Sequence, residues 1–452
     1  MGIPRFFINI IKKYKNTHFR GKGFEFQNLF MDYNAFLYPS MIEFSKKYSY
    51  EEVKKLTDTK RETLLAEFIT NRTINYVNEL KPEKLLYIAF DGPAPRSKMK
   101  LQRYRRYGGV KQREYLEELK KEYKMEEKSV SSLFNSASLS PGTTLMEKIA
   151  KHLIVASKKK KFMNGKIAVI INDTTIPGEG EHKILNFIRM LKNLKDKIVI
   201  FSPDADMVVL SLQYEGDIYV IQGRDSNKKA HVLLYPDNSL KYIVFSITKY
   251  REALEKEFNF VNDLDEIRLS RDVIFLSFFV GNDFIKPIFF TKSNKNYSFD
   301  IILNIYKRIL SKYKNTEDPY LVKINNEATV NHNFFMDIVK ELANMEDRSM
   351  KNYYQRLLNK INKEPERVED TYEAKESEFI HQYYYVSTNP FYEPEIFKKI
   401  DYNAQHNVWK NQYYSEYFGL SLNNMSEFSS YKNLVCQKYL QSLTYCLRYY
   451  LT

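Results

Sequence analysis

The chain has 452 residues, too many for one ordinary domain, and 43% hydrophobic with 15% aromatic residues is enough for a sizeable core, which excludes a disordered protein. Its formal net charge of +14 favours a polyanionic partner, although an A+T-rich genome alone would also enrich lysine, asparagine and tyrosine. The longest apolar run, 273–280, is too short to span a membrane, and Cys436 and Cys446 lack the spacing of a disulfide framework or a zinc site. We therefore expect a folded protein of a reducing intracellular compartment, with no membrane segment.

Short strand-like runs alternate with helical patterns through the first half of the chain. The predicted strands are 28–31, 85–90, 167–171, 197–201 and 217–222, and the helical patterns include 143–156 and 181–194. This alternation predicts a parallel sheet and an α/β fold. Segments 128–140 and 158–161 are predicted loops, and the lysines of the second are read as a solvated loop in preference to a nuclear import signal. A densely charged stretch, 345–377, predicts a surface helix or linker before an aromatic-rich end.

Acidic residues follow or adjoin several of the apolar runs. They are Asp32, Asp91, Glu179, Glu181, Asp204, Asp206 and Asp283. Residues just past the carboxyl ends of parallel strands converge on one crevice, so these widely spaced acids can meet there. Because so many carboxylates repel one another unless divalent cations lie among them, the pattern predicts a metal-dependent phosphoryl-transfer site. Oxygen ligands indicate two Mg²⁺ ions, or Mn²⁺, one activating water and the other stabilising the leaving oxygen.

Two of the acidic blocks share one spacing. An extended Glu179-Gly180-Glu181 would place both side chains on the same side of the backbone, and Asp204 and Asp206 repeat that spacing. A single pair of this kind is more often a helix cap or a solvated turn. Several such blocks together favour the metal site, whereas His182, which follows Glu181, is expected to have a structural role.

A basic helix is predicted directly after Asp91. Lys98, Gln102, Arg105 and Arg106 fall at i, i+4, i+7 and i+8 and therefore share one helix face, while Gly108 and Gly109 are expected to interrupt or bend the helix. Their converging donors suit a terminal phosphate, which arginine can bind through two oxygens. A general basic face for a duplex backbone is the alternative, and the nearness to Asp91 favours the pocket.

Seven motifs occur in an order that resembles the XRN family of 5′→3′ exoribonucleases. They are MGIPRFF, LFMDYNAFLY, FDGPAPRSKMKLQRYRRY, SPGTTLMEKIA, IPGEGEHKILNFIR, SPDADMVVLSL and FLSFFVGNDF. The resemblance implies a PIN-like, flap-nuclease-related core in which the seven acids hold two Mg²⁺ ions. It also implies that Lys98, Gln102, Arg105 and Arg106 bind the 5′-monophosphate of single-stranded RNA, in a pocket too small for a cap or a triphosphate.

We accordingly expect an α/β, parallel-sheet core with a mostly helical C-terminal lobe. The expected division is a nuclease core at 1–345, a charged linker or surface helix at 346–377 and a helical lobe at 378–452. The expected activity is Mg²⁺-dependent 5′→3′ hydrolysis of 5′-monophosphorylated RNA in mRNA decay, by a monomer to which a decapping enzyme would supply substrate. The expected location is the cytoplasm, although the sequence does not separate it from the nucleus.

Two positions depart from the family pattern. Tyr38 stands where the family has a histidine that stacks on the 5′ base, and an aromatic ring can still stack there; the alternative is a core residue of an amphipathic helix. The sequence ends at Thr452, about where the family continues into the segment with its second stacking aromatic. Hydrolysis is therefore expected, whereas processive movement along the RNA is not expected with it. Trp409, the only tryptophan, is expected to pack in the second region.

Two other function classes remain open at this point. A structure-specific 5′ flap DNA nuclease would use the same acids, but it would normally carry a helical DNA clamp that the sequence does not reveal. A non-catalytic RNA-binding protein is the second alternative, and the presence of all seven acids disfavours it.

Overall fold

The computed structural model describes residues 6–20, 24–124, 130–134, 136–191, 195–223, 242–261, 264–288, 298–361, 371–377, 379, 399–421 and 423–451. The first residues of the MGIPRFF block, the aromatic run 381–392 and the end of the helix predicted to reach 194 lie outside these residues. Within them, no helix is both long enough and apolar enough to cross a membrane.

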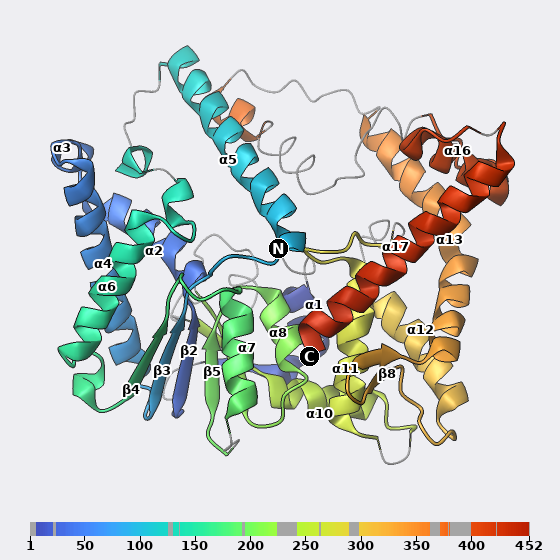
Figure 1. Cartoon of the computed structure of the whole chain (residues 1–452), viewed down its shortest axis with the longest axis horizontal. Helices are drawn as coiled ribbons and strands as arrows, with labels where there is room; N and C mark the ends of the chain where they lie inside the picture. The colour runs from blue at the N-terminus through green and yellow to red at the C-terminus, as the bar shows by residue number, and fades with distance from the viewer. Residues whose placement is uncertain are drawn as a thin grey trace. The chain divides into compact units, whose positions relative to one another are not determined.

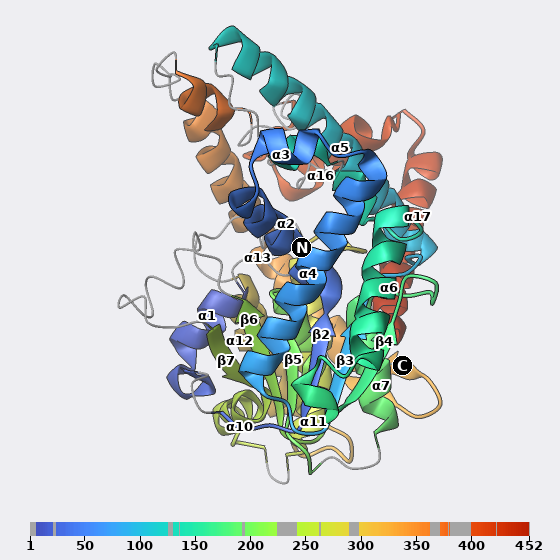
Figure 2. The same cartoon turned by 90° about the vertical axis from the view of Figure 1, so that its left-hand side faces the viewer.

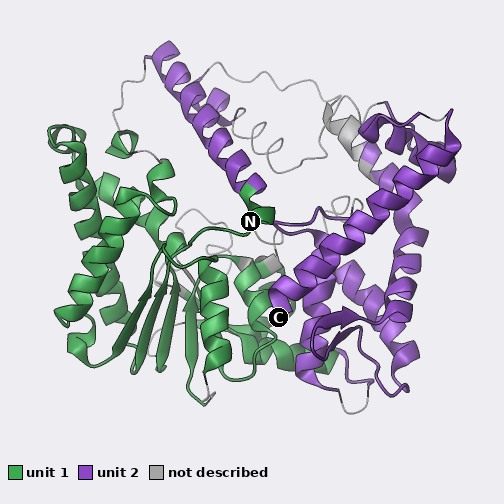
Figure 3. Ribbon diagram, in the orientation of Figure 1, with its two compact units in different colours: residues 1–99, 127–257 green, residues 100–126, 258–452 purple. Residues whose placement is uncertain are grey.

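The chain divides into two compact units, which Figure 3 colours separately. Unit 1 contains residues 1–99 and 127–257, and unit 2 contains residues 100–126 and 258–452. Helix α5 (Arg96–Glu122) begins in unit 1 and continues in unit 2, and α13 (His332–Ile361) runs through position 345. The domain boundaries expected from the sequence, at 345 and 377, stay predictions.

Unit 1 is built on a seven-stranded sheet with the order β1-β7-β6-β5-β2-β3-β4, seen edge-on in Figure 1. Five strands run parallel: β2 (Asn28–Asp32), β3 (Leu85–Ala89), β4 (Ala168–Asn172), β5 (Ile198–Phe201) and β6 (Ile218–Gly223). At one edge β7 (Tyr242–Ser246) runs antiparallel to β6, and β1 (His18–Arg20) runs antiparallel to β7. The central strands β2, β3 and β5 are almost entirely buried, as expected for parallel strands covered on both faces.

Helices cover both faces of this sheet. Successive residues of a strand point to opposite faces, so an apolar strand presents apolar side chains on both faces, and both need a covering layer. Leu29 and Met31 of β2 lie in the core beneath α2 (Tyr33–Lys47), α4 (Asp58–Leu80) and α6 (Thr144–Lys158), which lie in front of the strands in Figure 2. Phe30, between them, contacts Phe187 of α7 (Gly180–Met190) on the other face, with ring centroids 5.9 Å apart. The other described helices of unit 1 are α1 (Phe6–Lys13), η1 (Lys15–Thr17), α3 (Tyr50–Lys54), η2 (Val130–Leu133), η3 (Ser136–Leu139), η4 (Met163–Gly165), α8 (Ala205–Ser211) and α10 (Ile247–Glu257).

Unit 2 is mostly helical in its described residues. Besides α5 and α13 it contains α11 (Glu266–Ser277), η5 (Phe278–Val280), α12 (Ser298–Tyr313), α16 (His406–Phe418), α17 (Met425–Leu451) and the hairpin of β8 (Val322–Ile324) and β9 (Ala328–Val330). Trp409 is only 3% exposed and packs with Met350, Ile400 and Tyr402. The expectation that this tryptophan packs in the second region is confirmed.

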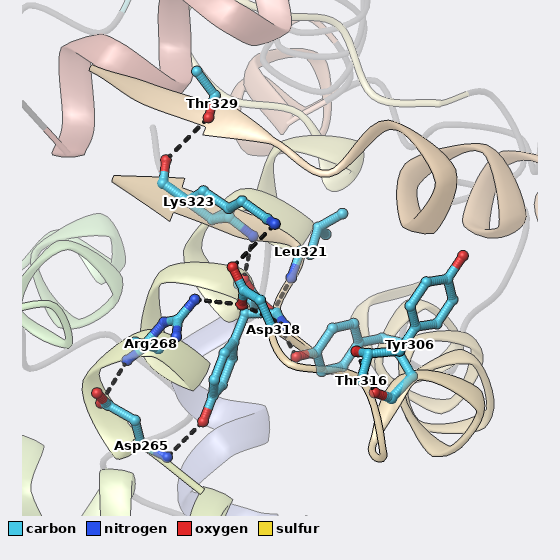
Figure 4. Close-up of polar contacts among 12 residues, drawn as sticks. Asp265, Arg268, Tyr306, Thr316, Asp318, Leu321, Lys323 and Thr329 are labelled. Atoms are coloured by element: carbon cyan, nitrogen blue, oxygen red, sulfur yellow. Dashed lines mark hydrogen bonds and ion pairs between the residues drawn. The ribbon is translucent and has the colours of Figure 1, made fainter. Parts of the chain in front are cut away.

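A buried carboxylate ties α11, α12 and β8 together in unit 2. Asp272 accepts hydrogen bonds from the Tyr306 hydroxyl at 2.6 Å and from the backbone N–H groups of Leu321 and Val322 at 2.8 and 2.7 Å. Beside it, Asp318 pairs with Arg268 and Lys323, as Figure 4 shows. Burial raises the pKa of Asp272 to about 7, and its three hydrogen-bond donors oppose that shift.

The expected α/β fold with a parallel-sheet core and a mostly helical C-terminal part is confirmed. Each predicted parallel strand lies within a residue of its observed bounds. One prediction about the basic helix is wrong: α5 continues through Gly108 and Gly109, and Gly109 lies where an added Cβ would meet nothing within 4 Å. The edge strands β1 and β7 were not predicted.

Candidate active site

Six of the seven predicted acids lie at the carboxyl edge of the sheet in unit 1. Asp32 is the last residue of β2, and Asp91 follows β3 by two residues. Glu179 and Asp204 are the N-cap residues of α7 and α8, and Glu181 and Asp206 lie in the first turns of these two helices. The positive ends of the two helix dipoles therefore face the acids, which favours their ionised form.

Glycine allows the strand ends to approach α7 closely. The Gly180 N–H donates to Asp91 Oδ1 at 2.7 Å. A Cβ added at Gly180 would lie 3.0 Å from the Ala89 carbonyl oxygen and 3.1 Å from Asp32 Oδ1. Only glycine fits here without displacing these oxygens. The first turn of α7 can therefore lie directly against the acids at the ends of β2 and β3.

The acids are close enough to perturb one another. Burial raises the pKa of Asp32 well above its ordinary value, and the neighbouring Asp91 and Asp204 raise it further. Burial also raises the pKa of Glu181 well above its ordinary value, and Asp32 and Asp206 add to the shift while Lys98 opposes it. Burial first, and the neighbouring carboxylates second, therefore disfavour the ionised forms of Asp32 and Glu181.

Two lysines of unit 1 supply the positive charge in this cluster. Lys98 forms an ion pair with Glu179, and both side chains are largely buried, at 12% and 8% exposure. The ammonium of Lys183 donates to the backbone carbonyl of Asp173 at 2.8 Å, and burial lowers the pKa of Lys183 to about 8 while Asp91 opposes this. Lys98 is therefore in direct contact with one of the acids.

The donor set fits a hard divalent cation, because it offers carboxylate oxygens and few competing nitrogens. In the positions that the structure describes, however, no three histidine, cysteine, aspartate or glutamate side chains are grouped so that they could hold a metal ion. The Lys98 ammonium lies where it partly neutralises the same charge. Binding a metal would therefore need these side chains to rearrange.

The predicted phosphate-binding residues all lie on α5. Lys98 belongs to unit 1, whereas Gln102, Arg105 and Arg106 belong to unit 2, where Arg105 Nη2 donates to Asp283 Oδ1 at 2.8 Å. The Asp283 side chain is 9% exposed and that of Arg105 is 37% exposed. The seventh acid is thus paired with a predicted phosphate ligand, and the pocket itself stays a prediction.

Tyr38 lies on α2 and is 55% exposed. It is not a core residue, so the alternative weighed for this position is wrong. The stacking role of its ring stays a prediction.

Sequence reasoning misjudged one acidic block and missed two supporting residues. Glu179-Gly180-Glu181 is not extended, because helix α7 begins at Gly180. Ser202 Oγ, which donates to Asp32 Oδ2 at 3.2 Å, and Asn34, whose Oδ1 accepts from the Asp91 N–H at 3.1 Å, were not singled out. Both lie within two residues of a predicted acid, and this proximity was the available signal.

Family models identify the chain. The model of the XRN 5′-3′ exonuclease N-terminus matches residues 1–223, and that of the Xrn1 helical domain matches residues 263–405. The chain belongs to the XRN family. The resemblance drawn from the acidic and basic motifs is therefore confirmed.

Individual XRN relatives match over most of this chain but over much less of their own length. The 5′-3′ exoribonuclease 2 of Candida glabrata is 30% identical over 367 residues, which are 71% of this chain and 34% of the relative. The 5′-3′ exoribonuclease 1 of Saccharomyces cerevisiae is 31% identical over 338 residues, which are 69% of this chain and 21% of the relative. The chain spans about a third or less of these two relatives, so their activities are not transferred to it directly.

Among solved structures, the catalytic core of Rad2 in complex with DNA substrate is similar over 76% of this chain and 78% of that chain. The identity is 14% and the TM-score 0.34. A likeness at this level adds nothing to the fold described above.

Proposed function

We propose that this XRN family member is a 5′→3′ exoribonuclease that hydrolyses 5′-monophosphorylated RNA with two Mg²⁺ ions. The observation that carries the proposal is the gathering of six acids at the carboxyl edge of the unit 1 sheet, with pKa values of Asp32, Asp91 and Glu181 raised by burial. Such a cluster is costly without a cation and is of the kind that binds divalent metals.

The acids would hold the metal ions, with Asp32, Asp91, Glu179, Glu181, Asp204, Asp206 and Asp283 as the ligand set. When bound, the two ions would activate a water and stabilise the leaving oxygen of the phosphodiester. Ser202 and Asn34 would keep Asp32 and the Asp91 backbone in place through the hydrogen bonds described above.

The basic helix would select the 5′ end. Lys98, Gln102, Arg105 and Arg106 would donate to a 5′-monophosphate, and Tyr38 would stack on the first base. Arg105 is held by Asp283 in this structure, so the guanidinium is oriented before substrate arrives. A role in mRNA decay, a cytoplasmic monomer and a decapping enzyme as partner are further proposals that accompany this function.

The test is a panel of RNAs that share one sequence and differ at the 5′ end: monophosphate, hydroxyl, triphosphate and cap. The proposal expects rapid loss of the monophosphate RNA with Mg²⁺ and none with chelator. A flap DNA substrate is included to test the alternative function, a structure-specific 5′ flap DNA nuclease. Faster cleavage of the flap than of the monophosphate RNA would overturn the proposal, as would equal cleavage of all four RNA ends.

A further inference from the structure

A basic cleft lies in unit 1 at the sheet edge formed by β1 and β7. Its volume is about 690 Å³, and its lining includes four lysines and one glutamate: Lys13, Lys15, Lys249, Lys256 and Glu252. The helical turn η1 lies against both α1 and α10, whose placement Figure 2 shows. The lysines therefore come from two stretches of chain more than two hundred residues apart.

Strand directions place this cleft away from the acids. Ser246, the last residue of β7, pairs with Tyr219 near the start of β6, and His18, the first residue of β1, pairs with Phe245. The turn before β1 and the start of α10 thus lie at the amino edge of the parallel strands, whereas the acids lie at the carboxyl edge. With about 3.3 Å per strand residue, the two edges are roughly 15 Å apart.

The walls of the cleft are well packed. Thr17 is buried, and its hydroxyl donates to the Tyr14 carbonyl oxygen at 2.7 Å. The Tyr14 ring lies 5.4 Å from that of the buried Tyr250, and Glu257 accepts from the Tyr14 hydroxyl and from Lys13 Nζ. One acid thus joins the end of α1 to the end of α10, which fixes the two sides of the cleft.

Three of the lysines are not neutralised by these contacts. Lys15, Lys249 and Lys256 are exposed, and no ion pair joins them to another residue that the structure describes. Lys249 Nζ lies 6.0 Å from the centroid of the Phe19 ring, a cation–π contact that leaves its hydrogen-bond donors available. These three ammonium groups outnumber Glu252, the acid in the lining of the cleft, so the cleft attracts a polyanion such as a phosphate backbone.

We propose that this cleft is a second RNA-binding site, which holds the phosphate backbone of a single-stranded RNA at a distance from the acids. The identity of the polyanion rests on the proposed function, and the cleft itself does not. A chain with a formal charge of +14 has the long-range field to attract such a strand, and the cleft supplies a fixed place for it.

The test is binding of a circular RNA of about 20 nucleotides in chelator, because a circle has no 5′ end and no cleavage occurs. The test variant is the triple change Lys15→Gln, Lys249→Gln and Lys256→Gln. Its matched control is Lys158→Gln, Lys159→Gln and Lys161→Gln, which neutralises three exposed lysines elsewhere in unit 1.

The expected result is a loss of affinity of about tenfold or more in the test variant, with the salt slope reduced by about 2 for three lost contacts. The control should bind like the wild type. Equal affinity and slope in all three proteins would overturn the second site, and so would equal losses in both variants. Displacement of the circle by polyglutamate as readily as by RNA would overturn its assignment to RNA.

These outcomes are independent of the proposed activity. If monophosphate RNA is degraded but the test variant binds the circle normally, only the second site fails. If the test variant loses circle binding but no RNA is degraded, only the exoribonuclease proposal fails.

Discussion

Arg105 and Asp283 form an ion pair with 2.8 Å between Nη2 and Oδ1, although 178 residues separate them in the chain. The pair joins a residue proposed to bind the 5′-phosphate to one proposed to bind metal. A carboxylate that is 9% exposed and holds one edge of a guanidinium leaves the other edge for a second acceptor. In this structure Asp283 therefore fixes the orientation of the Arg105 guanidinium, the group proposed to bind the phosphate.

Changing Arg105 to alanine should lower kcat/KM on 5′-monophosphate RNA by about 10- to 100-fold, the cost of one charge-assisted hydrogen-bonding group. Cleavage of 5′-hydroxyl RNA should fall much less, because that end offers no phosphate. Arg103→Ala, an exposed arginine on the same helix, is the control. An unchanged ratio of the two kcat/KM values would contradict the role of Arg105.

Changing Glu181 to glutamine should lower Mg²⁺-dependent cleavage by about 100-fold or more, on the scale of losing one electrostatic catalytic group. The same change should raise the free energy of unfolding in chelator by about 1 kcal/mol, because it removes a buried carboxylate whose pKa is raised by burial. Glu67→Gln, on the exposed side of α4, should alter neither quantity. Lower stability in chelator would show that the cluster is not strained by its own charge.

Changing Gly180 to alanine should reduce cleavage by at least about tenfold. Its Cβ would lie 3.0 Å from the Ala89 carbonyl oxygen and 3.1 Å from Asp32 Oδ1, so these oxygens would have to shift, and Asp32 would leave the geometry that cleavage needs. Gly109→Ala is the matched control: that position is open, so the change should preserve activity and stabilise α5 by up to about 1 kcal/mol. Cleavage assays and thermal unfolding of both variants make the comparison. Wild-type activity in Gly180→Ala would contradict the close packing.

Asp272 should make the stability of unit 2 depend on pH. Its pKa is raised by burial from 3.8 to about 7, so its stabilising contribution is complete below about pH 4 and is lost as the pH rises through 7. The difference in unfolding free energy between the wild type and Asp272→Asn should therefore shrink from pH 4 to pH 8, by on the order of 4 kcal/mol at most. Urea unfolding can follow it through Trp409, which is buried in the same unit. A constant difference across this range would show that the carboxyl is ionised throughout.

The local sequence pattern was sufficient to predict the parallel strands and the position of six acids at their carboxyl ends. Asp32, Asp91 and Asp204 each follow an apolar run, and chain connectivity alone brings such strand ends to one edge. The edge strands were not predictable in the same way, because β1 has three residues and pairs with β7 across more than two hundred positions. The start of α7 at Gly180 also depends on a distant partner, the Asp91 carboxylate.

Charge pairing was the least predictable property. Nothing local indicates that Arg105 meets Asp283, that Lys98 meets Glu179, or that Asp272 is buried in a helix with the polar sequence EIRLSRD. Tertiary packing fixes both pairs and the burial of Asp272. The helix-face pattern identified Lys98 and Arg105 as related residues, and only the structure shows which carboxylates they contact.

The order of product release tests the central proposal most directly. One 5′-monophosphate RNA is labelled either at its first internal phosphate or at its 3′ end, and both forms are followed over time with Mg²⁺ or chelator. The account predicts that mononucleotides appear at once from the 5′ label and only late from the 3′ label, with neither released in chelator. Early release from the 3′ label, internal fragments of intermediate length as first products, or equal turnover in chelator would contradict it.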